Sequence, residues 1–240
     1  MSVARAGNIV HRAFGLWSLC ALALALAPAA DASQCYGSTA HGRLEHSATL
    51  DGAGYARPYS ALGVAWGRTE VHASVAAVVS AAYRQLREQS PTVHYVYGES
   101  GWPTGGPFPP HRTHQNGLSV DFFVPVRNGR GQSVPLPTSA LNRFGYDIEF
   151  DRQGRYRDLT IDFAAMAEHL YALQRAAQAA GIGIAQVIFD PVLLPRLYAT
   201  PRGPALRQLH FMPRQAWVRH DEHYHVDFAL PCADLARSPH

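Results

Sequence analysis

The chain has 240 residues, of which 47% are hydrophobic, and its formal net charge is +3 at pH 7. This length fits one domain plus a targeting segment, and the apolar content excludes a disordered chain. The weak positive balance is spread along the chain, so the composition also argues against a nucleic-acid-binding protein.

Residues 1–32 have the pattern of a signal peptide. Two arginines precede an apolar run at 13–27, which is too short for a comfortable membrane span. The segment 30–32 (Ala-Asp-Ala) has the small-x-small pattern of a cleavage site. We therefore expect secretion, and a mature domain over 33–240 with no stable membrane span. An uncleaved membrane anchor is the alternative.

Two cysteines, Cys35 and Cys232, remain near the two ends of the expected mature domain. In an oxidising compartment, an even pair of cysteines favours one disulfide. In the loop-entropy model a bond closing so long a loop contributes about 4–5 kcal/mol. Two buried free thiols are the alternative.

The first half of this domain combines one helix with two strands. Apolar residues recur on one face from Glu70 to about Glu88, which predicts a helix with Thr69 as its N-cap. The β-branched and aromatic segment 92–97 predicts a strand. A loop dense in glycine and proline follows at 98–110, and segment 117–125 then has the composition of a buried strand.

The second half repeats this mixture of elements. The polar segment 127–157 is interpreted as a variable surface excursion. An amphipathic helix is predicted over 162–180, with Asp162 as its N-cap. Apolar strands are predicted at 184–189 and 223–230. The predicted class is α+β, with a small antiparallel sheet flanked by helices.

Two clusters hold most of the candidate functional residues. The first contains His111, His114 and Asp121, and the second contains His220, His223 and His225. Residues two apart in an extended strand face the same side, so the last two histidines should project together. Pairing their strand with segment 117–125 would bring His114, Asp121 and His225 to one point.

Two imidazoles and one carboxylate suit a catalytic zinc site. Such a set leaves the fourth position of the ion open, and a water there has a pKa of roughly 7. We expect one zinc ion per chain, held by His114, Asp121 and His225. The same ligands would also accept other divalent ions.

The remaining residues of the two clusters are candidates for proton transfer and substrate contact. His223 should lie beside the metal without binding it, as a general base and acid. His220 and His111 could stabilise charge on the reaction intermediate or orient their neighbours, or be ordinary loop histidines. Glu222 is a rival base. Glu99 could contact substrate or be a solvated carboxylate.

These spacings resemble a known group of enzymes. His114-x6-Asp121 followed by His223-x-His225 is similar to the signature of the LAS zinc peptidases, the group of lysostaphin, the D-Ala-D-Ala peptidases and the hedgehog fold. The sequence segment GWPTGG…HRTHQNGLSVDFF resembles the penicillin-insensitive murein endopeptidases, whose site loop contains an SHQxGLDxD core. The resemblance covers about 99–124 and 184–232, and Cys35 and Cys232 resemble a terminal disulfide of that group.

The resemblance implies a LAS/hedgehog-like fold and a periplasmic zinc-dependent D,D-endopeptidase. Its substrate would be peptidoglycan, cut at the D-Ala to meso-diaminopimelate cross-link. The implied ligands are His114, Asp121 and His225, and the implied catalytic base is His223.

Two departures from the family pattern bear on the substrate. Ser119 replaces an acidic residue, and segment 127–157 does not match. A D,D- or L,D-carboxypeptidase or another wall hydrolase with the same zinc site is therefore an alternative. A non-catalytic wall-binding module is a further one.

Overall fold

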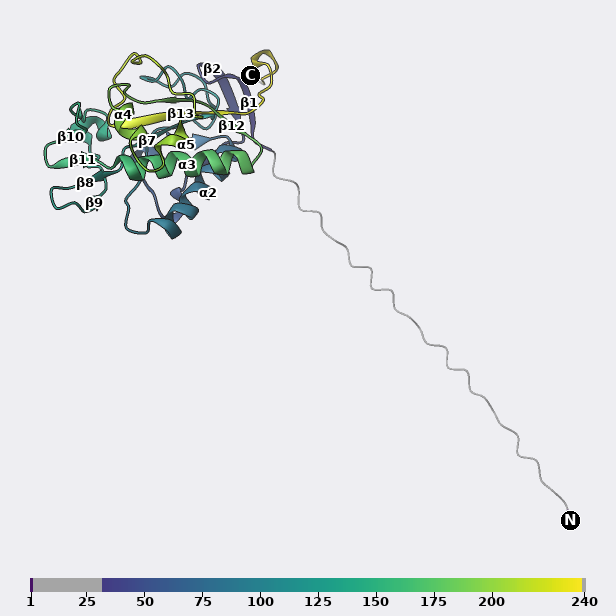
Figure 1. Ribbon diagram of the computed structural model, residues 1–240. Coiled ribbons are helices and arrows are strands. Elements are labelled where there is room, and N and C mark those ends of the chain that lie inside the picture. Colours follow the sequence, from purple (N-terminus) through teal and green to yellow (C-terminus); the bar gives the residue numbers. More distant parts are fainter. Residues whose placement is uncertain (2–31, 239–240) are drawn as a thin grey trace. The chain divides into compact units, whose positions relative to one another are not determined.

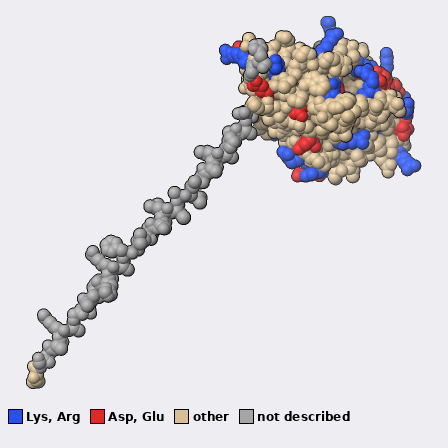
Figure 2. All heavy atoms as spheres, turned by 180° about the vertical axis from the view of Figure 1, so that it is seen from behind, with Lys and Arg blue, Asp and Glu red and all other residues tan. Residues whose placement is uncertain are grey.

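The computed structural model describes residues 32–238, together with Met1 (Figure 1). The predicted signal peptide therefore lies outside the described residues, apart from its first and last positions. None of the helices in the described part is long and apolar enough to cross a membrane. On the face shown in Figure 2, arginines and acidic side chains lie interspersed among uncharged residues.

A five-stranded sheet occupies the centre of the domain. Its strands are, in spatial order, β12 (Gly183–Ile188), β13 (His223–Ala229), β7 (Ser119–Phe123), β6 (Val96–Tyr97) and β4 (Arg57–Pro58). All neighbours are antiparallel except β4 and β6, which pair in parallel. The predicted α+β class is confirmed, and the prediction of a purely antiparallel sheet is wrong at this edge. The LAS/hedgehog-like assignment stays a prediction.

Smaller elements surround this sheet. The other strands are β1 (Gln34–Ser38), β2 (His41–Glu45), β3 (Ala48–Thr49), β5 (Glu70–Val71), β8 (Val126–Arg127), β9 (Ser133–Val134), β10 (Arg155–Tyr156) and β11 (Leu159–Ile161). The helices are α1 (Ala61–Ala65), α2 (Ala73–Gln89), α3 (Phe163–Ala179), α4 (Leu194–Tyr198) and α5 (Gly203–Leu206), with 3₁₀ turns η1 (Gly52–Gly54), η2 (Ala140–Gly145) and η3 (Leu235–Arg237).

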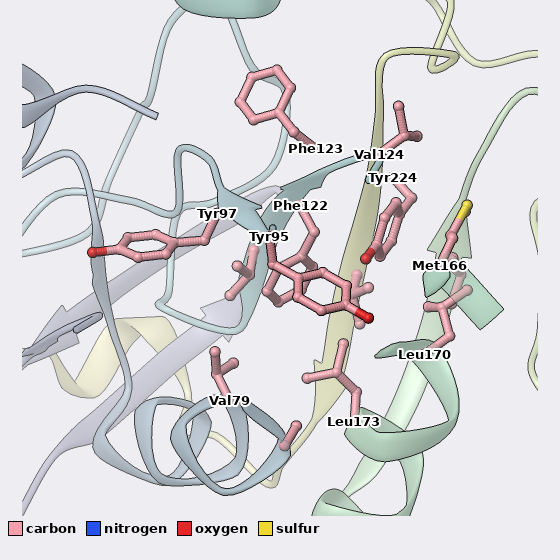
Figure 3. Packing of buried hydrophobic residues seen from close by; sticks show 14 of the residues in the cluster. Val79, Tyr95, Tyr97, Phe122, Phe123, Val124, Met166, Leu170, Leu173 and Tyr224 are labelled. Carbon is pink, nitrogen blue, oxygen red and sulfur yellow. The ribbon is translucent and has the colours of Figure 1, made fainter. Parts of the chain in front are cut away.

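Helices α2 and α3 pack side by side against one face of the sheet (Figures 1 and 3). Strand alternation sends Phe122 of β7 and Tyr224 of β13 toward these helices, where both contact His169 of α3. Each fully buried large apolar side chain contributes about 1.5–3 kcal/mol. The opposite face of the same two strands is therefore left for polar residues.

Helix α3 matches its prediction, whereas α2 begins later than expected. The Asp162 carboxylate accepts a hydrogen bond from the amide of Ala165, which confirms its role as N-cap. Glu70 and Val71 instead form β5, whose backbone pairs with β3. His72 is the actual N-cap of α2, because its Nδ1 accepts from Ser74. The prediction of Thr69 as N-cap is therefore wrong.

Segment 127–157 is more than a surface excursion. Its first and last parts pair into a four-stranded sheet of order β10-β11-β8-β9, completed by residues 159–161. Ile148 and Phe150 are buried in the core, and the Phe150 amide donates to the carboxylate of Asp221 just before β13. The prediction is wrong because apolar residues within this polar stretch anchor it against the domain.

A disulfide joins Cys35 in β1 to Cys232 after β13, as expected. Backbone hydrogen bonds reinforce this link, since Ala233 donates to Cys35 at 2.9 Å and Gly37 donates to Ala233 at 2.9 Å. The chain ends of the domain are therefore tied to each other and to the last strand of the central sheet.

Candidate active site

The polar face of strands β7 and β13 brings the two histidine clusters together. The two strands pair with His225 opposite Asp121 and His223 opposite Phe123. This is the pairing that was expected to bring His114, Asp121 and His225 together, although the period of two along each strand does not by itself determine which strands pair. Residues of this face are almost completely buried, so their interactions are little screened by water.

Asp121 lies at the centre of this cluster. Its Oδ1 lies 3.0 Å from His225 Nδ1 and 3.3 Å from His114 Nε2. Its Oδ2 lies 3.7 Å from both His223 Nε2 and His111 Nδ1. Burial raises the pKa of Asp121, but the imidazoles of His114 and His223 outweigh burial and hold the pKa well below its usual range.

The loop before β7 directs an unprotonated nitrogen of His114 at this carboxylate. The carbonyl of Ser100 only accepts hydrogen bonds, so His114 Nδ1, 3.1 Å away, carries a proton and donates it. Burial lowers the pKa of His114, which keeps the ring neutral and leaves a lone pair on Nε2. That buried Nε2 forms no hydrogen bond.

The backbone of this loop is unusual in two places. His114 has a φ of 71°, in the left-handed region that few non-glycine residues adopt. Gly117 has a φ of 76°, and a Cβ there would lie 2.7 Å from the backbone nitrogen of His72. This glycine therefore lets the chain turn tightly between His114 and β7.

Asp227 holds His225, the third candidate metal ligand, in place. It accepts from His225 Nε2 at 2.8 Å and from the hydroxyl of Ser119 at 2.6 Å. Burial would lower the pKa of His225, but Asp227 and Asp121 raise it to about 10. Since Nε2 is occupied by Asp227, Nδ1 is the nitrogen that faces Asp121.

This arrangement fits a metal cation. A lone pair of His114 and an oxygen of Asp121 lie 3.3 Å apart without a proton between them, which is unfavourable unless a positive charge lies there. A carboxylate behind an imidazole that faces such a centre is typical of metal sites. Ligand atoms of His111, His114 and Asp121 also lie within 4.8 Å of one another, so this group too could hold an ion.

His223 contacts a second carboxyl group. Its Nδ1 lies 2.7 Å from Glu222 Oε1, and its Nε2 points toward Asp121. Burial lowers the pKa of His223 to about 4 and that of His220 to about 3, so both rings are neutral at pH 7. The two rings lie 4.5 Å apart.

Glu99 is a buried ion-pair partner rather than a solvated carboxylate. It contacts Arg68 Nε at 2.5 Å, the Tyr59 hydroxyl at 2.9 Å and His111 Nε2 at 2.6 Å. Burial raises its pKa, but the hydrogen bonds from His111 and Arg68 outweigh burial and lower the pKa to about 2. Sequence reasoning left its role open, because its partners come from distant segments.

Tyr146 is a residue of the site that the sequence did not predict. Its hydroxyl donates to Asp121 Oδ2 at 3.1 Å and accepts from the amide of Glu99 at 3.1 Å. Its ring lies 5.1 Å from that of His223. No sequence signal marks this tyrosine, since it lies in segment 127–157 outside both histidine clusters.

A cleft of about 630 Å³ opens above these residues. His111, Tyr146, His220 and His223 line it, while the candidate ligands lie buried beneath. Trp217 and Val218 are exposed at its rim. A substrate in this cleft would meet the non-ligand histidines directly.

Two comparisons of the sequence with known proteins bear on its family. No curated protein matches the sequence. The family model described as penicillin-insensitive murein endopeptidase matches residues 35–237, which includes every residue of the site. The chain therefore belongs to the penicillin-insensitive murein endopeptidase family, a family of peptidases that act on peptidoglycan.

Proposed function

We propose that this protein is a periplasmic, zinc-dependent D,D-endopeptidase that hydrolyses D-Ala–meso-diaminopimelate cross-links in peptidoglycan. The observation that carries the proposal is the convergence of the unprotonated His114 Nε2, Asp121 Oδ1 and His225 Nδ1 beneath an open cleft. Family membership supplies the class of substrate.

His114, Asp121 and His225 would hold one zinc ion. When bound, zinc supplies Lewis acidity, which polarises a carbonyl group and lowers the pKa of water. Asp227 keeps His225 oriented through its 2.8 Å hydrogen bond, and Tyr146 keeps Oδ2 of Asp121 turned away through its hydroxyl. Both contacts leave His225 Nδ1 and Asp121 Oδ1 facing each other at 3.0 Å, and the metal would take the place of the proton between them.

His223 moves the proton. Its neutral ring accepts a proton at Nε2 from the water that attacks the scissile carbonyl, and returns it to the leaving amine. The ring of His111 borders the same space and is placed to stabilise charge that develops on the carbonyl oxygen. His220 lies against His223 and limits its rotation.

The test uses purified cross-linked muropeptide dimers incubated with the 33–240 protein, with and without a chelator. Mass spectrometry should show conversion of dimers to monomers that depends on metal and returns when zinc is restored. Uncross-linked pentapeptide monomers serve as the matched control, because a carboxypeptidase would shorten them and an endopeptidase would not.

Three outcomes would overturn the proposal. Full activity in strong chelator would exclude a metal mechanism. Loss of the terminal residue from monomers with dimers intact would indicate a carboxypeptidase. Binding to peptidoglycan without any released fragment, in protein that contains zinc, would indicate a non-catalytic wall-binding module.

The periplasmic location of the protein is tested in a separate experiment. The signal-peptide prediction requires that the protein recovered from the periplasmic fraction begins at Ser33. N-terminal sequencing or intact mass of that fraction checks this, and a chain that retains residues 1–32 in the membrane fraction would indicate an anchor.

A further inference from the structure

Glu222 is a buried acidic residue that the mechanism above does not use. Its side chain is almost fully enclosed, with 3% of the residue exposed, and it lines the catalytic cleft. Within the described residues, no arginine lies within ion-pair distance of its carboxyl group, and the ring of His223 is its side-chain hydrogen-bond partner. A buried carboxyl group without a compensating cation is costly, which makes Glu222 a candidate for a specific role.

The geometry relates this carboxyl group to one nitrogen of one histidine. Glu222 Oε1 lies 2.7 Å from His223 Nδ1, while His223 Nε2 faces Asp121 Oδ2 at 3.7 Å. An imidazole that donates from Nδ1 in its neutral form carries a lone pair on Nε2. The oxygen Oε1 can accept this hydrogen bond whether or not Oε2 carries a proton.

The orientation of the ring matters for this site. A neutral imidazole with its proton on Nε2 would present N–H to the carboxylate of Asp121 and could not accept a proton there. The rings of Tyr146 and His220 lie 5.1 and 4.5 Å from His223 and restrict its tilt, but aromatic contacts do not select a tautomer. A hydrogen-bond acceptor beside Nδ1 is needed to favour the tautomer that carries its proton on Nδ1.

We propose that Glu222 is a positioning residue that accepts the Nδ1 proton of His223 and thereby holds Nε2 unprotonated toward the metal site. This inference rests on the proposed function, in which His223 is the general base. It assigns to Glu222 a role through His223, in place of the direct role of a rival base. A Glu222 that served only as packing would be replaceable by an apolar side chain of similar size.

The experiment reads the tautomer of His223 directly. Zinc-loaded protein with ¹⁵N-labelled histidine is examined by NMR for wild type, Glu222→Leu and Glu222→Gln, and the His223 signals are identified by their loss in His223→Asn. Wild type should show the proton on Nδ1. Glu222→Leu should shift His223 toward the Nε2-protonated form while zinc content stays unchanged.

Kinetics on muropeptide dimers should follow the spectra. Glu222→Leu is expected to lower kcat by about 10- to 100-fold with little change in KM, since the acceptor acts through the base. Glu222→Gln keeps the shape and a carbonyl oxygen, and should restore both the Nδ1 tautomer and most of kcat. Glu88→Leu changes an exposed glutamate of α2 and is the matched control for the same Glu-to-Leu replacement away from His223.

Two results would overturn the inference: an unchanged His223 tautomer in Glu222→Leu, or a tautomer and a kcat that change independently across the variants. The spectra require no turnover, so they separate this inference from the proposed function. A wild-type protein that is inactive but carries the proton on Nδ1 would refute the peptidase and leave the role of Glu222 intact.

Discussion

Two glutamate–histidine pairs face the same oxygen of Asp121, yet their surroundings differ. Glu99 contacts His111 at 2.6 Å and Glu222 contacts His223 at 2.7 Å, and both histidines lie 3.7 Å from Oδ2. Arg68 also binds Glu99, and hydrogen bonds hold its pKa at about 2 despite burial. Burial raises the pKa of Glu222 well above its usual range, and the neighbouring acidic groups add to this.

The difference shows that one hydrogen-bond pattern can serve two purposes. The Glu99 pair is part of an ionic network that ties the loop before β7 to Tyr59 and Arg68. The Glu222 pair has no arginine, and the carboxyl group interacts with the imidazole and with the backbone of residues 221 and 222 instead. We therefore expect the first pair to matter mainly for stability and the second mainly for catalysis.

The largest effect is expected at Asp121, which both glutamate–histidine pairs face. Asp121→Ala removes a ligand and the carboxylate around which the four histidines gather, so turnover should fall by about 10⁴-fold or more. Zinc content by elemental analysis should fall in parallel, while circular dichroism stays close to wild type because the β7–β13 backbone pairing remains. Stoichiometric zinc together with wild-type turnover would contradict the assignment.

Substitution of the two paired histidines should separate their roles. His223→Asn should lower kcat by about 10³-fold, in the range of a lost general base, with zinc retained. His111→Asn should have a smaller effect on kcat and also retain zinc. If His111→Asn lost zinc and His225→Asn kept it, the ion would instead be held by His111, His114 and Asp121.

The same amide substitution should affect stability differently at the two glutamates. Glu99→Gln leaves Arg68 without its counter-charge and should lower the free energy of unfolding at pH 7 by about 2 kcal/mol. Glu222→Gln removes a carboxyl group that is unfavourable when ionised, so stability should stay equal or rise. Urea denaturation of both variants measures this, and equal destabilisation would remove the contrast.

The acid dependence of stability adds a second measurement at Glu99. Its pKa in the folded protein, about 2, lies below the ordinary value of 4.5. The stabilisation is therefore complete above pH 4.5 and is lost as the pH falls toward 2. Wild type should lose more stability than Glu99→Gln in this window, and parallel curves would contradict the ionic role.

The smallest effect is expected at Tyr146, whose hydroxyl links Glu99 to Asp121. Tyr146→Phe removes the hydroxyl between Glu99 and Asp121, leaving a buried amide and a carboxylate oxygen each short of one partner. Zinc affinity should fall about tenfold and stability by about 1 kcal/mol. Competition with a chromogenic chelator measures the first, and unchanged affinity would show that the hydroxyl does not orient Asp121.

The sequence by itself determined the features that depend on residues close together in the chain. The period of two along segment 223–230 placed His223 and His225 on one face, and the 3.6-residue period with Asp162 as N-cap predicted α3. The pair Cys35 and Cys232 was deduced from compartment and number alone. The motif spacings were sufficient to suggest the family, which the match over 35–237 confirms.

Only the tertiary structure decided which residues surround these motifs. Glu99, Arg68 and Tyr146 come from separate segments without a periodic or spacing signal, and long-range hydrogen bonds join them to each other and to Asp121. Backbone pairing with β3 likewise took Glu70 and Val71 out of the predicted helix. Long-range hydrogen bonds and burial override local preference there, and such contacts leave no local pattern in the chain.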